Sequence, residues 1–136
     1  MMNVEQVKQI SENSKREKWP YPRTFQAFRE AGVVSYRNML ADHTTVFFGG
    51  DGTSYEEMAP EGAGPGLAVA DMYDGEAVRR DLAHHQQHRT PYVEFVQDMA
   101  RAGVRYYEVN MERRVVIYTS GRAGESYTED VPVPVE

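Results

Sequence analysis

The chain has 136 residues, of which 40% are hydrophobic and 26% charged, and it contains no cysteine. This composition predicts a folded globular protein, and the lack of cysteine excludes disulfides, thiolate nucleophiles and cysteine-based metal sites. A formal net charge of −6 argues against an extended contact with nucleic acid or an anionic membrane, since both require a positive surface. The N-terminus lacks the apolar core of a signal peptide, and no stretch has the apolar length of a membrane span, so we expect a cytoplasmic protein.

The first sixty residues predict two helices followed by three strands. Apolar residues at helical spacing indicate helices at about Val4 to Lys15 and Pro22 to Glu30. Runs of β-branched and aromatic residues then predict strands, which we place at 33–39, 44–49 and 54–58. In the stretch GGDG before the third strand, the glycines and Asp51 suit the positive φ angles of a tight hairpin turn.

A segment rich in glycine and proline separates this unit from the next. Residues 59–66, APEGAGPG, predict a loop. The following stretch LAVADMY, residues 67–73, fits either an extra strand or an extended lead-in. The loop is too short to separate two independent domains, so we expect a single domain over residues 1–136.

The second half predicts the same order of elements. Asp74 is placed to cap a helix from about Gly75 to His88. Thr90 and Pro91 predict the N-cap and first residue of a second helix. Gly103 predicts its end, because a glycine after a helix adopts the left-handed conformation without steric cost. Three strands are then predicted, at 104–111, 113–120 and 125–131.

The two halves also share residues in one register. An offset of 71 residues, which becomes 72 after one insertion, relates many positions of the first half to identical residues in the second. Examples are Val7 and Val78, Gly32 and Gly103, Tyr36 and Tyr107, Tyr55 and Tyr127, and Glu57 and Glu129. We predict an internal duplication, with repeats at 1–60 and 74–136 joined by 61–73. Because about 70 residues support only a marginal core, the predicted α+β fold has two antiparallel meanders sharing one core, with the helices packed on the sheet.

Three stretches, HHQQHRTPYVEF, ARAGVRYYEVNMERRVVIY and GESYTEDVP, resemble the C-terminal signature of a small prophage-associated bacterial family of unknown function. This family is typified by YbcV and YdfO, and its members are sometimes labelled phage envelope protein. The stretch WPYPRTFQAFREAGVVSYR resembles the N-terminal segment of the family, so the likeness covers nearly the whole chain. The chain departs from the family pattern at His88, Pro91 and Val96, which argues against a shared catalytic use of these positions. The resemblance implies an α+β fold, a prophage origin and an uncharacterised function.

The stretch HHQQH contains the densest group of chemically versatile side chains. His84 and His88 are four residues apart and share a helix face, which is the spacing that a metal ion needs. No third ligand and no HExxH glutamate accompany them, so we favour exposed histidines at a helix C-terminus and expect no metal or cofactor. His85 faces elsewhere, where it is expected to form a hydrogen bond within the structure or to contribute to a partner-binding surface.

Tyrosines on the predicted strands are the second group of candidates. Tyrosine combines an apolar ring with a polar hydroxyl, and a sheet rich in it can bind a partner protein. The candidates for partner binding are Tyr36, Tyr55, Tyr107, Tyr118 and Tyr127, together with His85. The alternative interpretation, which carries more weight, is that they are packing residues repeated in each half.

No catalytic set is assembled by the sequence. The glycine-rich stretches lack the lysine of a phosphate loop, and no serine has the context of a nucleophile elbow. We therefore favour a non-enzymatic module that binds a host or phage protein. The alternative class is an enzyme or small-ligand binder with a pocket between the two repeats, and nucleic-acid binding is a lesser alternative. A further hypothesis is a homodimer, formed when edge strands pair across a two-fold axis.

Overall fold

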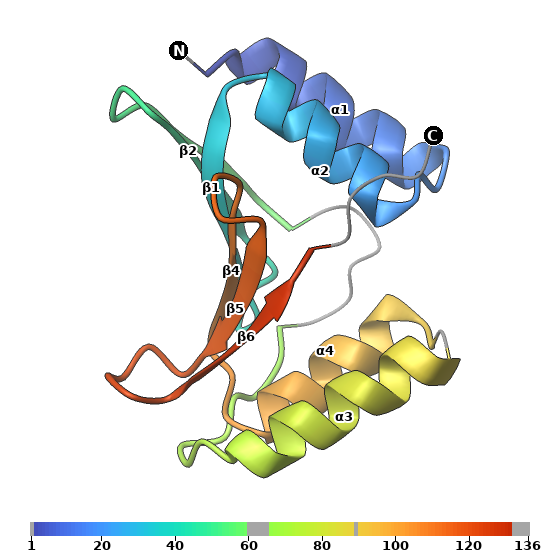
Figure 1. Cartoon of the computed structure of the whole chain (residues 1–136), viewed down its shortest axis with the longest axis vertical. Helices are drawn as coiled ribbons and strands as arrows, with labels where there is room; N and C mark the ends of the chain where they lie inside the picture. The colour runs from blue at the N-terminus through green and yellow to red at the C-terminus, as the bar shows by residue number, and fades with distance from the viewer. Residues whose placement is uncertain (1, 60–65, 89, 132–136) are drawn as a thin grey trace.

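The computed structural model describes residues 2–59, 66–88 and 90–131. Two helices followed by three strands occur twice along the chain. The elements are α1 (Val4–Arg16), α2 (Tyr21–Glu30), β1 (Val33–Met39), β2 (Thr45–Gly49), β3 (Ser54–Glu57), α3 (Gly75–His88), α4 (Tyr92–Arg101), β4 (Tyr106–Asn110), β5 (Val115–Thr119) and β6 (Ser126–Asp130). All four helices lie on one side of the sheet, as two separate pairs (Figure 1). The predicted α+β class is confirmed.

The six strands form one antiparallel sheet in the order β3-β2-β1-β4-β5-β6. The two meanders therefore join through β1 and β4 at the centre. There Arg37 lies opposite Glu108, and the same two positions are related by the 71-residue offset. Tyr36 lies opposite Val109, and Asn38 lies opposite Tyr107. This register places an approximate two-fold axis through the Arg37–Glu108 pair. The internal duplication of the sequence stays a prediction.

The joints between helices and strands form as the sequence predicts. The Asp74 carboxylate accepts a hydrogen bond from the Ala77 amide at 3.1 Å and so caps the start of α3. After α2 and α4, Gly32 and Gly103 adopt φ angles of 95° and 89°. Only glycine adopts such angles without strain, so each glycine ends its helix and lets the chain turn into the sheet.

The predicted start of α4 is wrong by one residue. Pro91, not Thr90, occupies the N-cap, and no side chain caps this helix. The Thr90 hydroxyl instead bonds Nδ1 of His85, at the end of the preceding helix. A tertiary hydrogen bond has therefore replaced the local cap that the sequence suggests.

Two predicted connections differ in detail from the structure. In the β2–β3 hairpin only Gly52 takes a positive φ, of 86°, while Asp51 accepts a hydrogen bond from the Thr53 amide at 3.2 Å. Residues 67–73 form no strand; they are a lead-in to α3 with a bend at residues 71–72. It is held against the end of α4, because Ala70 and Asp74 donate backbone hydrogen bonds to Ala100 and Ala102. Residues 60–65 of the predicted loop lie outside the described residues.

Buried side chains form two adjoining clusters on the helix-covered face of the sheet. The first lies under α1 and α2 and contains Val7, Phe25 and Phe28. The second lies under α3 and α4 and contains Val78 and Met99. Tyr107 of β4 and Val116 of β5 pack against both clusters, so the two meanders share one sheet and a continuous apolar layer. Among the described helices, none is both long enough and apolar enough to span a membrane.

Candidate functional site

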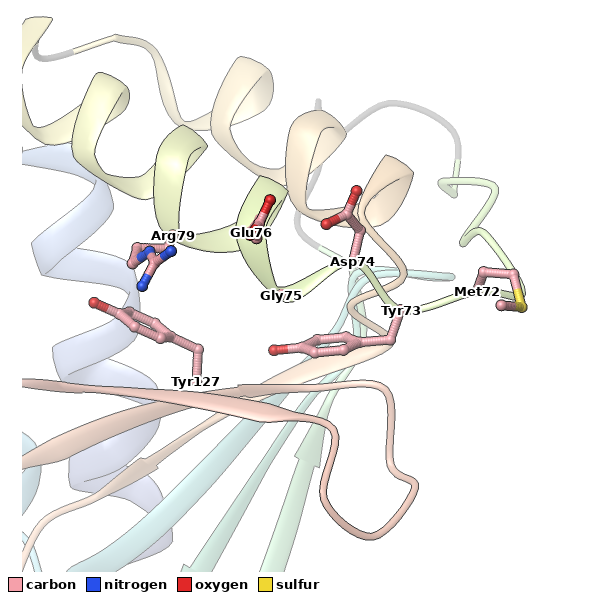
Figure 2. A pocket seen from close by; sticks show the side chains of 7 residues that line it. All are labelled: Met72, Tyr73, Asp74, Gly75, Glu76, Arg79 and Tyr127. Carbon is pink, nitrogen blue, oxygen red and sulfur yellow. The ribbon is translucent and has the colours of Figure 1, made fainter.

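Two surface grooves occupy corresponding places in the two halves. The β3 groove, of about 560 Å³, lies between α1 and the edge strand β3. The β6 groove, of about 630 Å³, lies between the start of α3 and the other edge strand, β6 (Figure 2). Side chains lining the β3 groove include Lys8, Glu12, Lys15, Tyr55 and Glu57. Those lining the β6 groove include Tyr73, Asp74, Glu76, Arg79 and Tyr127.

The mouth of each groove pairs a cation with a tyrosine. The Lys8 ammonium lies 5.5 Å from the centroid of the Tyr55 ring. At the corresponding positions, Arg79 of α3 lies above Tyr127 of β6 (Figure 2). Burial, together with the nearby Glu57 carboxylate, raises the pKa of Tyr55, which keeps its hydroxyl protonated as a hydrogen-bond donor. A carbonyl or carboxylate is the kind of group that this arrangement would attract.

A carboxylate on each edge strand ties that strand to its helix. Glu57 accepts hydrogen bonds from the Ser11 hydroxyl at 2.6 Å and from the Lys15 ammonium at 3.4 Å. Its counterpart Glu129 accepts from the Gln86 amide at 2.9 Å. In both halves a polar contact therefore links a helix to its edge strand.

The grooves differ in charge and in one unsatisfied hydroxyl. Three cations and two carboxylates line the β3 groove, namely Lys8, Lys15, Arg16, Glu12 and Glu57. The β6 groove has Arg79 alone beside its two carboxylates, Asp74 and Glu76. In the β6 groove the Tyr73 hydroxyl is buried without a hydrogen-bond partner among the described residues. Burial, together with the nearby Glu125 carboxylate, raises the pKa of Tyr73, so this hydroxyl stays protonated.

Tyr73→Phe is expected to leave the free energy of unfolding unchanged or to raise it by up to about 1 kcal/mol, because it removes a buried polar group that has no partner. Tyr107→Phe is the matched control. Its hydroxyl accepts a hydrogen bond from the Asn38 amide at 2.8 Å, so the same change should cost about 1 kcal/mol. Urea denaturation of both variants measures the difference. Equal losses would show that the Tyr73 hydroxyl has a partner in solution.

The main chain of both edge strands presents hydrogen-bonding groups outward. In β6, the Ser120 amide donates to Glu125 and the Val131 amide to Arg114, so residues 125, 127, 129 and 131 face β5. Backbone groups of Ser126, Thr128 and Asp130 therefore point away from the sheet. In β3, the Gly49 amide donates to Thr53, so residues 53, 55 and 57 face β2. The backbone groups of Ser54 and Glu56 therefore point away from the sheet. No described strand pairs with either edge.

Each groove also carries an exposed methionine at its rim. Met58, which follows β3, is 70% exposed, and Met72, which precedes α3, is 80% exposed. Methionine is flexible and polarizable, so it adapts to many apolar surfaces. Neither residue is predicted as a site from the sequence, since an isolated methionine next to a loop carries no periodic signal.

The predicted histidine candidates separate in the structure. His84 and His88 share an exposed helix face, with ring centroids 4.6 Å apart. Among the described residues, no three histidine, aspartate or glutamate side chains gather in a way that could hold a metal ion. His85 is buried, and it lies in the α3–α4 hairpin away from both grooves.

His85 joins a hydroxyl to a carboxylate. Its Nε2 lies 2.7 Å from Oδ2 of Asp98, and its Nδ1 bonds the Thr90 hydroxyl. Asp98 also accepts a hydrogen bond from Arg101 at 2.9 Å. The order hydroxyl, imidazole, carboxylate is that of a nucleophile relay, but no member of the network lines either groove. We therefore assign the network to the packing of α3 against α4.

The predicted tyrosines occupy the helix-covered face of the sheet. Tyr36 and Tyr118 are buried, and Tyr107 is half-buried between them. The Tyr36 and Tyr21 hydroxyls lie 2.6 Å apart. Of the five predicted tyrosines, Tyr55 and Tyr127 line the two grooves. A partner-binding role for these tyrosines stays a prediction. Each of the two grooves lies within its own half of the chain rather than between the halves.

The fold and the grooves define a two-layer α+β protein with paired surface sites and, within the described residues, no assembled metal centre. The chain belongs to the family described as Protein of unknown function (DUF1398), whose model matches residues 8–130. No functionally curated protein matches the chain. The prediction of an uncharacterised family is confirmed, while its prophage association stays a prediction.

Proposed function

We propose that the protein is a non-enzymatic interaction module that binds an extended segment of a partner protein along an edge strand. The observation that carries this proposal is that each edge strand, with which no further described strand pairs, lies beside a groove. A segment added to the edge would gain main-chain hydrogen bonds, while alternate side chains would enter the groove. Following the family resemblance, we further propose that the partner is a host or phage protein.

The β3 edge is the better binding site of the two. Its groove has three cations against the two carboxylates Glu12 and Glu57, and this positive excess favours an acidic segment, to which Tyr55 adds a donor. Met58 at the rim supplies apolar contact. In the β6 groove, Asp74 and Glu76 stand beside the single arginine and would repel the same segment.

Glu56→Pro is the sharpest test, because it removes an outward amide without breaking a bond to β2. Proline is tolerated at such an edge position, so the fold should persist, as circular dichroism would verify. Glu56→Ala is the matched control, since it loses the same carboxylate and keeps the amide. Affinity capture from cell lysate with the wild type, both variants and Thr128→Pro should recover a partner that only Glu56→Pro loses. Equal recovery by all four, or a stoichiometric small molecule with no protein, would contradict the proposal.

A further inference from the structure

The sheet face opposite the helices is covered by no described element (Figure 1). At its centre, Nε of Arg37 lies 2.5 Å from Oε1 of Glu108. The guanidinium carbon of Arg37 also lies 5.8 Å and 4.9 Å from the ring centroids of Phe48 and Tyr106. These contacts place the two rings on the same uncovered face as the ion pair.

Apolar side chains complete the centre of this face. Val46 lies directly opposite Arg37 on β2, and Ile117 lies directly opposite Glu108 on β5. Residues directly opposite in an antiparallel pair point to the same side of the sheet. The middle of the uncovered face is therefore an apolar surface around one pair of opposite charges, which is unusual for a face that only meets water.

The symmetric placement of the two charges favours a second copy of the chain as the binding partner of this face. Arg37 and Glu108 lie side by side across the approximate two-fold axis of the sheet. A second copy, turned about an axis parallel to the central strands, would set its own glutamate over Arg37 and its own arginine over Glu108. The four charges would then alternate in sign, and the surrounding apolar residues of both copies would meet.

We propose that this face binds a second copy of the chain, forming a two-fold dimer in which the two sheets pack face to face. The inference is independent of the proposed strand addition, which uses the outer edges. Six strands about 4.8 Å apart and five residues of about 3.3 Å each span roughly 400 Å² in projection. Side chains raise the accessible area above this value, toward the about 800 Å² that each partner buries in a standard interface.

Charge reversal at the centre separates contacts between copies from contacts within one copy. Arg37→Glu leaves two acidic groups at the centre of each face, and Glu108→Arg leaves two basic groups. Each variant alone would juxtapose four like charges and should sediment with the 15.5 kDa mass of one chain at about 100 µM. An equimolar mixture would juxtapose acidic with basic centres, so it should recover the dimer mass of the wild type. Mixing cannot restore the pair within a single chain, so this recovery reports only contact between copies.

Sedimentation equilibrium at about 0.15 M salt gives the masses. Both variants should fold, because a half-exposed ion pair contributes little to stability, and circular dichroism verifies this. If a variant fails to fold, Ile117→Lys takes its place and should yield monomers, while Gln87→Lys, at an exposed position of α3 on the helix-covered side, should stay dimeric. A monomeric wild type, or variants that keep the dimer mass alone, would overturn the proposal. So would loss of the dimer only in the double variant Glu56→Pro/Thr128→Pro, because that result would place the contact at the strand edges.

Discussion

Gly103→Ala is expected to lower the free energy of unfolding by more than about 3 kcal/mol. The residue adopts a φ of 89°, where a side chain alone costs about 1–2 kcal/mol. A Cβ atom would lie 2.4 Å from the Met72 carbonyl oxygen and 2.7 Å from the Tyr73 Cα. Because both are main-chain atoms, the lead-in to α3 must move, which also strains the 2.8 Å bond from the Asp74 amide to Ala102. The melting temperature measures the loss.

Gly124→Ala is the matched control for this prediction. Gly124 also has a positive φ, of 80°, but no atom lies within 4 Å of the Cβ position. The same substitution should therefore cost only the backbone strain, about 1–2 kcal/mol. Similar melting temperatures for the two variants would mean that the close approach of residues 72 and 73 is absent in solution.

Gly103 also illustrates how far sequence analysis reaches. Its role as a helix stop follows from local signals, namely an apolar helical pattern before it and alternating residues after it. The strand segments after both stops are predicted for the same reason. The lead-in packed against Gly103 has no such signal, because its position depends on a contact between segments some thirty residues apart.

The pairing of strands at the centre of the sheet is a second feature that the sequence does not predict. The 71-residue offset predicts that the two halves have the same elements, and it relates Arg37 to Glu108. It does not predict that β1 and β4 pair, because any of several strand orders would bury the same apolar residues. The antiparallel register across β1 and β4 is thus determined by tertiary packing. The same holds for the uncovered face and its charge pair, which depend on that register.

The grooves depend partly on features visible in the sequence and partly on tertiary packing. Tyr55 and Tyr127, and Glu57 and Glu129, are related by the offset, so their equivalence is visible in the sequence. The grooves beside them arise from the spacing between a helix and an edge strand, which no local pattern encodes. In the HHQQH stretch the periodicity identifies the shared face of His84 and His88, but the chemistry of the buried His85 comes from Asp98, thirteen residues away.

His85→Ala is expected to lower the free energy of unfolding by about 2–3 kcal/mol. The ring is buried and bonded at both nitrogens, so its loss opens a cavity beside Phe95 and leaves the Thr90 hydroxyl without its partner. The Asp98 carboxylate keeps Arg101 and partial contact with water, which limits the penalty. Asp98→Asn should cost less, about 1 kcal/mol, because an amide oxygen still accepts from Nε2.

His84→Ala is the control for this network, since the neighbouring ring is exposed and the change should stay within about 0.5 kcal/mol. Guanidinium titrations of the three variants should therefore rank His85→Ala as the least stable, then Asp98→Asn, then His84→Ala. A packing role also requires that the His85→Ala protein, kept well below its melting temperature, still captures the partner of the β3 edge. Loss of capture in a folded His85→Ala protein would instead show that the relay of Thr90, His85 and Asp98 takes part in function.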